Sequence, residues 1–176
     1  MKKSVQFLLL FLMCISASWT WASDAPERTV LFNMGDYDSQ YWRIPALVTA
    51  ADNSLVAVVD KRGSSLGDLP NTISIMSRRS TDNGKNWSEP VVVAQGGNGK
   101  TYGDPAVVLD KKTGNLICMF VGDQGLWNAT PYNRQGIYVS KSTDNGVSWS
   151  EPVAITDQVY ANHSGWYAGF AGSGHG

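Results

Sequence analysis

A twelve-residue segment occurs twice in this chain, and that repeat constrains the fold more than any other feature. Residues 80–91 read STDNGKNWSEPV, and residues 142–153 read STDNGVSWSEPV, 62 positions later with two of the twelve positions changed. Upstream, PALV at 45–48 returns as PAVV at 105–108. Because the spacing drifts by only two residues across a whole unit, the repeat indicates a recurring structural unit.

Each unit is predicted to hold four short strands, because apolar and β-branched runs alternate with turn signals such as Asp82-Asn83-Gly84. Four antiparallel strands that recur at this length are typical of propeller blades. After the N-terminal segment, no apolar period of 3.6 residues is long enough to predict a helix. We therefore expect an all-β chain with strands near 44–49, 54–60, 72–79 and 90–94 in the first unit and 105–109, 115–121, 136–141 and 152–156 in the second.

The repeated segment also has a structural logic of its own. Asp82 can accept hydrogen bonds from backbone N–H groups a few residues on, and Gly84 can supply a positive φ. The indole of Trp87 then folds over the turn and into the blade. A carboxylate that works on substrate is the alternative, but an active site is needed once and this hairpin occurs twice. The positions expected to be structural are Ser80, Asp82, Gly84, Trp87, Ser142, Asp144, Gly146 and Trp149.

The N-terminus predicts a secretory signal peptide. Lys2 and Lys3 precede an apolar run at 7–13 that is shorter than the about 20 residues a transmembrane helix needs. Small residues place the cleavage after Ala22, so the protein is expected to be exported to the periplasm, the medium or the cell surface. Met13 before Cys14 argues against a lipoprotein, and no transmembrane segment is expected.

Charge and cysteine content exclude other classes. The net charge of −1 gives no basic field for nucleic acid. Cys118 is the one cysteine after the predicted signal, so we expect a small buried hydrophobic residue and no intramolecular disulfide. His163 and His175 lack metal-ligand spacing. Neither a metal nor a cofactor is expected.

We call each copy of the repeated segment, at 80–91 and 142–153, a box. Two boxes preceded by Arg43-Ile44-Pro45 resemble the Asp-box (BNR-repeat) sialidases, neuraminidases that cleave terminal sialic acid, especially secreted bacterial ones. The resemblance runs from about Tyr41 to Gly176. It implies a six-bladed β-propeller of four-stranded antiparallel blades, of which about two are present. The expected divisions are a signal peptide at 1–22, a lead-in at 23–40, and a partial propeller at 41–176 with blades at 41–95 and 102–157 and the start of a third at 165–176.

The resemblance assigns roles to two arginines. Arg43 matches the first member of the family's arginine triad, which binds the sugar's carboxylate, and a planar guanidinium suits that group because it can meet it bidentately. Arg62 matches an arginine near the sugar's 4-position. Asp60, two residues earlier, is expected to hold that arginine or the turn.

Two aspartates and a tryptophan complete the implied site. Asp68, in a loop rich in glycine and serine, matches the family's general acid, with a solvated turn aspartate as the alternative. Asp104 is placed at the position of the second blade equivalent to Arg43, and it matches the aspartate that binds the N-acetyl arm. Trp127 is expected to line the pocket for the acetyl methyl group, with ordinary blade packing as its alternative.

The implied activity is a retaining exo-α-sialidase acting on sialylated glycoproteins, glycolipids and oligosaccharides, with a place in ganglioside and oligosaccharide catabolism. The family's tyrosine nucleophile, its glutamate partner and two further arginines are expected beyond the matched blades, so this chain is expected to be a truncated, inactive fragment. The alternative is a non-catalytic carbohydrate-binding propeller. A purely structural repeat protein would leave Arg43, Arg62, Asp68 and Asp104 without a role.

Overall fold

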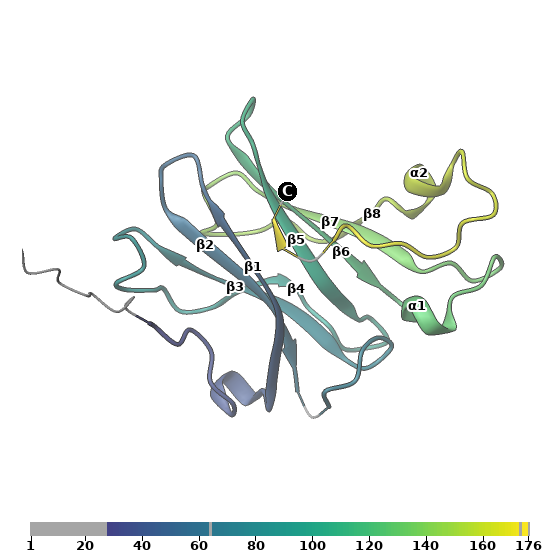
Figure 1. Ribbon diagram of the computed structural model, residues 1–176, viewed down its shortest axis with the longest axis horizontal. Helices are drawn as coiled ribbons and strands as arrows, with labels where there is room; N and C mark the ends of the chain where they lie inside the picture. The colour runs from purple at the N-terminus through teal and green to yellow at the C-terminus, as the bar shows by residue number, and fades with distance from the viewer. Residues whose placement is uncertain (1–27, 64, 173, 176) are drawn as a thin grey trace, which may run out of the picture.

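The computed structural model describes residues 28–63, 65–172 and 174–175, which form two β-sheets side by side (Figure 1). The predicted signal peptide and Cys14 lie outside the described residues. Within the described part, no helix has the length and apolar character needed to cross a membrane.

The first sheet contains four antiparallel strands in sequence order, β1-β2-β3-β4. The central pair forms an unbroken ladder, and twelve of its sixteen residues are buried, including three valines of β2 and two isoleucines of β3. Four strands at these positions are what the sequence predicts. Their bounds are β1 Tyr41–Thr49, β2 Leu55–Arg62, β3 Ile73–Ser80 and β4 Val91–Ala94.

The second sheet repeats this order and adds a fifth strand, giving β8-β7-β6-β5-β9. The added strand β9 pairs parallel to β5 at Ala106 and Val107. It falls in the segment expected to begin a third blade, where the described residues form no other strand. The bounds are β5 Tyr102–Asp110, β6 Asn115–Gly122, β7 Gly136–Ser142, β8 Val153–Ala154 and β9 Gly174–His175.

Three short helical turns lie outside the sheets: η1 (Asp36–Asp38), α1 (Gly125–Asn128) and α2 (Thr156–Tyr160). The sequence predicts no helix, because segments of three to five residues are too short to show a 3.6-residue period. α2 also replaces the end of the strand expected at 152–156, which leaves β8 with two residues.

One apolar core joins the two sheets. Val56, Val58 and Ile75 from the first sheet pack with Leu116 and Phe120 from the second, all fully buried. The strands β1 and β5 lie next to each other where the sheets meet (Figure 1). Cys118 is buried in this core, as the sequence predicts, and burial holds the pKa of its thiol above the ordinary range.

The first box is a self-contained turn. Asp82 Oδ1 accepts from Ser80 Oγ at 2.8 Å and from the backbone N–H of Asn86 at 2.8 Å. The Asn86 backbone bond, followed by its side-chain bond, lowers the pKa of Asp82 to about 2. Gly84 has a φ of +85°, and Trp87 Nε1 donates to the carbonyl of Gly84 at 2.9 Å. The indole therefore closes its own turn.

The second box makes the same turn but contacts the first sheet as well. Trp149 Nε1 donates to Ser77 Oγ on β3 at 2.9 Å, and Arg79 Nε donates to the carbonyl of Asn145 at 3.0 Å. A Cβ on Gly146 would lie 2.7 Å from a methyl of Val56. Only glycine fits there, so this box fixes one sheet against the other.

Candidate active site

The two sheets meet at a matched pair of β-bulges. β1 is irregular just after Arg43 and β5 just after Gly103, and in each bulge the residue before a proline has a positive φ: +55° at Ile44 and +57° at Asp104. The left-handed region is unfavourable for a β-branched residue such as isoleucine, so this backbone is strained. The bulges align Asp104 with Ile44. The prediction that Asp104 is equivalent to Arg43 is therefore wrong by one residue, because Gly103 occupies that place.

A buried ion pair lies beneath the bulges. Arg62 Nη2 donates to Asp60 Oδ2 at 2.8 Å, Arg62 Nε donates to the same oxygen at 3.3 Å, and both side chains are inaccessible to solvent. The other oxygen, Oδ1, accepts from the backbone N–H of Asp104 at 3.1 Å. Burial raises the pKa of Asp60 to about 7 although Arg62 favours its ionised form. The expectation that Asp60 holds the arginine is confirmed.

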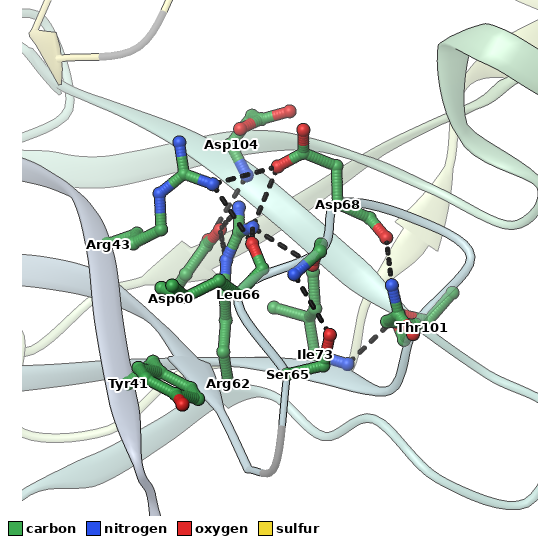
Figure 2. Close-up of polar contacts among 12 residues, drawn as sticks. Tyr41, Arg43, Asp60, Arg62, Ser65, Leu66, Asp68, Ile73, Thr101 and Asp104 are labelled. Atoms are coloured by element: carbon green, nitrogen blue, oxygen red, sulfur yellow. Dashed lines mark hydrogen bonds and ion pairs between the residues drawn. The ribbon is translucent and has the colours of Figure 1, made fainter.

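The loop after β2 closes over both arginines (Figure 2). Arg62 Nη1 donates to the carbonyls of Leu66 at 2.9 Å and Gly67 at 3.0 Å and to Asp68 Oδ1 at 2.7 Å. Arg43 Nη1 donates to the same carbonyl of Leu66 at 3.1 Å and the same oxygen of Asp68 at 3.3 Å. Two of the three loop acceptors, the carbonyl of Leu66 and Oδ1 of Asp68, are thus shared between the two guanidinium groups.

The two arginines differ in the donors they have left. All three nitrogens of Arg62 are engaged, and its side chain is 1 % exposed. The side chain of Arg43 is 41 % exposed, and its Nε and Nη2 have no hydrogen-bond partner among the described residues. Arg43 can therefore receive a carboxylate from outside, while Arg62 holds the loop from below.

The carboxylate of Asp104 is half-buried and accepts no hydrogen bond from the described residues. Burial raises its pKa, the positive charges of Arg62 and Arg43 oppose that change, and Asp68 adds to it. Its free oxygens are thus available to an N–H or O–H group of a ligand. Asp68 instead contacts both guanidinium groups (Figure 2).

A hollow of about 260 Å³ joins these charged groups to an apolar wall. Arg43, Asp68 and Asp104 line one part of it. Trp127 on α1 lines the same hollow and is 81 % exposed, so it is not a packing residue within the described structure. The hollow therefore brings together four of the five predicted site residues, and only Arg62 lies outside its lining.

Five residues of the hollow were not predicted as site residues: Ile44, Leu69, Leu126, Gln135 and Phe170. Gln135 stands in no motif, and Phe170 lies in a glycine-rich segment without periodicity, so neither carried a signal. No tyrosine lines the hollow in the part of the chain that the structure describes. Across the same residues no three His, Cys, Asp or Glu side chains gather as a metal site. The exposed His163 stacks on Trp166.

Comparison with known proteins identifies the architecture. Residues 44–176 match the BNR repeat-like domain. A sialidase of Bacteroides fragilis is 34% identical over 161 residues, covering 81% of this chain and 29% of the relative. A sialidase of Micromonospora viridifaciens is 35% identical over 147 residues, covering 77% of this chain and 22% of the relative. This chain therefore spans less than a third of the length of either relative.

Solved structures agree with that match. The Hadza microbial sialidase Hz136 superposes with a TM-score of 0.71 at 31% identity, covering 81% of this chain and 31% of that one. The NanB sialidase of Streptococcus pneumoniae superposes with a TM-score of 0.72 at 16% identity, covering 84% of this chain and 40% of that one, which shows the fold alone. The predicted all-β fold with propeller blades is confirmed, and this chain belongs to the BNR-repeat (Asp-box) sialidase family.

Proposed function

We propose that the complete gene product containing this chain is a retaining exo-α-sialidase that removes terminal sialic acid from glycoproteins, glycolipids or oligosaccharides. One observation carries the proposal. Arg43 keeps two guanidinium nitrogens unengaged at a hollow that also holds Asp68, Asp104 and an exposed tryptophan. A sugar with its own carboxylate matches that combination, because a planar guanidinium is the preferred partner of a carboxylate.

Substrate binding begins at Arg43. Its free Nε and Nη2 donate to the sugar's carboxylate, and that negative charge repels the neighbouring carboxylate of Asp68. Asp68 shares Arg43 Nη1 at 3.3 Å, so the incoming group competes for the same guanidinium. The competition weakens the hold of Arg43 on the loop and frees Asp68 to face the glycosidic oxygen.

Asp68 then acts as the general acid and afterwards as the base for water. Its side chain can reach the glycosidic oxygen only after it leaves the two guanidinium groups that it contacts. Arg62 is a positioning residue in this account. It keeps the carbonyls of Leu66 and Gly67 anchored while the side chain of Asp68 moves.

The acyl arm of the sugar lies across the hollow. Asp104 accepts from the amide N–H with a carboxylate that has no other partner among the described residues. Trp127 covers the apolar end of the arm. Export through the predicted signal peptide would bring the site to sialylated glycans outside the cytoplasm, and the reaction would serve ganglioside and oligosaccharide catabolism.

The test is proton NMR of 3′-sialyllactose incubated with the complete gene product. We expect free sialic acid to appear first as the α-anomer, because two successive displacements retain configuration. Appearance of the β-anomer first would contradict the retaining mechanism. No release, combined with saturable binding of sialyllactose, would favour the carbohydrate-binding propeller, which the lack of a tyrosine in the described lining of the hollow makes the second candidate.

A further inference from the structure

The chain contains three Asn-Gly pairs, at 83–84, 98–99 and 145–146. All three adopt the same left-handed turn, because φ lies between +52° and +59° at the asparagines and between +81° and +86° at the glycines. Such a pair can react with itself in water. The backbone nitrogen of the glycine attacks the side-chain carbonyl carbon of the asparagine, ammonia leaves, and water opens the resulting succinimide to aspartate or isoaspartate.

The attack requires the peptide group between the two residues to rotate. The glycine nitrogen must come within bonding distance of the side chain, and the asparagine carbonyl oxygen moves with it because the peptide group is planar. A hydrogen bond at either end of this peptide group therefore slows the reaction. The nitrogen must also lose its proton to solvent, so burial of the N–H slows the reaction as well.

The peptide group at 145–146, in the second box, is held at both ends. The N–H of Gly146 donates to Ser142 Oγ at 2.8 Å. The carbonyl of Asn145 accepts from Arg79 Nε at 3.0 Å. Gly146 is also buried, so this pair is the most protected of the three.

The other two peptide groups are held less firmly. The N–H of Gly84 donates to Ser80 Oγ at 2.8 Å, whereas the carbonyl of Asn83 has no hydrogen-bond partner among the described residues. At 98–99, neither end of the peptide group has a partner in the part of the chain that the structure describes, and both residues are exposed. The backbone hydrogen bonds between residues 97 and 100 close this turn without engaging that peptide group.

We infer that Asn98 is a site of spontaneous modification to aspartate and isoaspartate, and that the first serine of each box protects the Asn-Gly pair of its own box. The rates should follow the number of held ends, with Asn98 fastest, Asn83 slower and Asn145 slowest. Isoaspartate lengthens the backbone by one carbon. Modification therefore disrupts the turn that leads into β5, the strand that carries Asp104.

The test is peptide mapping by mass spectrometry while the complete gene product is incubated in neutral buffer. One neutral hydrogen bond corresponds to about two- to tenfold in rate, so we expect that step from Asn98 to Asn83 and a further step of that size from Asn83 to Asn145. The same incubation in guanidinium chloride removes the fold, and there the three rates should converge. Equal rates in the folded protein, or the same ranking with and without the fold, would overturn the inference.

Two serine variants test the protection itself. Ser80→Ala removes the acceptor of the Gly84 N–H and should speed modification of Asn83 by about two- to tenfold. Ser88→Ala is the matched control, because this serine of the same box does not contact Gly84, and it should leave the rate at Asn83 unchanged. An unchanged rate at Asn83 in folded Ser80→Ala would contradict the role of the serine. The ranking of the three sites in the unmodified protein decides the inference even where a serine variant fails to fold.

Discussion

Replacing each arginine of the site by methionine should separate the one that holds the structure from the one that binds substrate. Arg62→Met leaves the carboxylate of Asp60 buried without its partner, and removing one member of a buried pair costs about 3–5 kcal/mol. Arg43→Met removes a contact to Asp68 whose partners are 41 % and 55 % exposed, and such pairs contribute about 0–1 kcal/mol.

These energies translate into distinct melting temperatures. For a chain of 176 residues, each kcal/mol shifts the midpoint by about 2–4 °C. We therefore expect Arg62→Met to melt about 6–20 °C below the unmodified protein and Arg43→Met to melt within about 4 °C of it. The activity of the complete gene product should show the opposite order, because Arg43 has the free donors.

The penalty at Arg62 should also depend on pH. Asp60 has a pKa of about 7 in the folded protein against about 3.8 as its ordinary value, so the folded state holds a proton that the unfolded state has lost between these values. The stability from this group is highest below pH 3.8 and declines as the pH rises towards 7. Arg62 opposes the rise in the pKa of Asp60, so this pKa should rise further in the Arg62→Met variant. The free energy of unfolding that the substitution costs should therefore grow from pH 5 to pH 8.

The assay is equilibrium unfolding in urea, followed by circular dichroism at pH 5 and pH 8. The double variant Asp60→Asn with Arg62→Met should recover part of the loss, since neither charge is then left alone. Equal, small losses for both arginine variants would refute the claim that Arg62 is a buried structural residue. A penalty that shrinks with rising pH would refute the protonation argument.

Three further outcomes are expected. In the complete gene product, Asp82→Ala should lower the melting temperature with little change in the catalytic rate of the protein that remains folded. Acid sensitivity from Asp82 should appear only as the pH falls from about 3.8 through about 2, as measured by acid unfolding. Trp149→Phe, which leaves the buried hydroxyl of Ser77 without its donor, should cost about 1–3 kcal/mol in urea unfolding, while the exposed Trp166→Phe should stay within about 0.5 kcal/mol. Asp68→Asn should slow natural sialosides by about 10²–10⁴ and spare acidic phenol leaving groups in steady-state assays, so equal losses on both would move the general acid elsewhere.

Most of the fold can be predicted from the repeat, because the sequence signals of the repeat are local. A twelve-residue turn motif depends on hydrogen bonds within a few residues, so Asp82, Gly84 and Trp87 can be interpreted without knowing what surrounds them. The motif does not predict the contact between Trp149 and Ser77 on the other sheet, because that contact joins residues 72 positions apart. The short helices are not predicted for a related reason, because three to five residues are too few for a 3.6-residue period to repeat.

The site is less predictable because it depends on burial and on single-residue register. The burial of Arg62 follows from a loop that closes over it, and no spacing in the sequence encodes that closure. The equivalence of Asp104 to Ile44 is an exception, because the sequence repeat at 45–48 and 105–108 already implies it and the two matching bulges keep that register. Gln135 has no motif, and only an inventory of hydrogen bonds shows its unpaired nitrogen.

The most direct test of the central claim, that Arg43 binds the carboxylate of a sialoside, is a cycle that changes both partners. The complete gene product and its Arg43→Met variant are assayed on sialyllactose and on its methyl ester, which lacks the charge. A charge-assisted hydrogen bond contributes about 1.5–3 kcal/mol, so we expect kcat/KM on sialyllactose to fall about ten- to a hundredfold and kcat/KM on the ester to change little. An equal loss on both substrates would contradict the account, because Arg43 would then act without contacting the carboxylate.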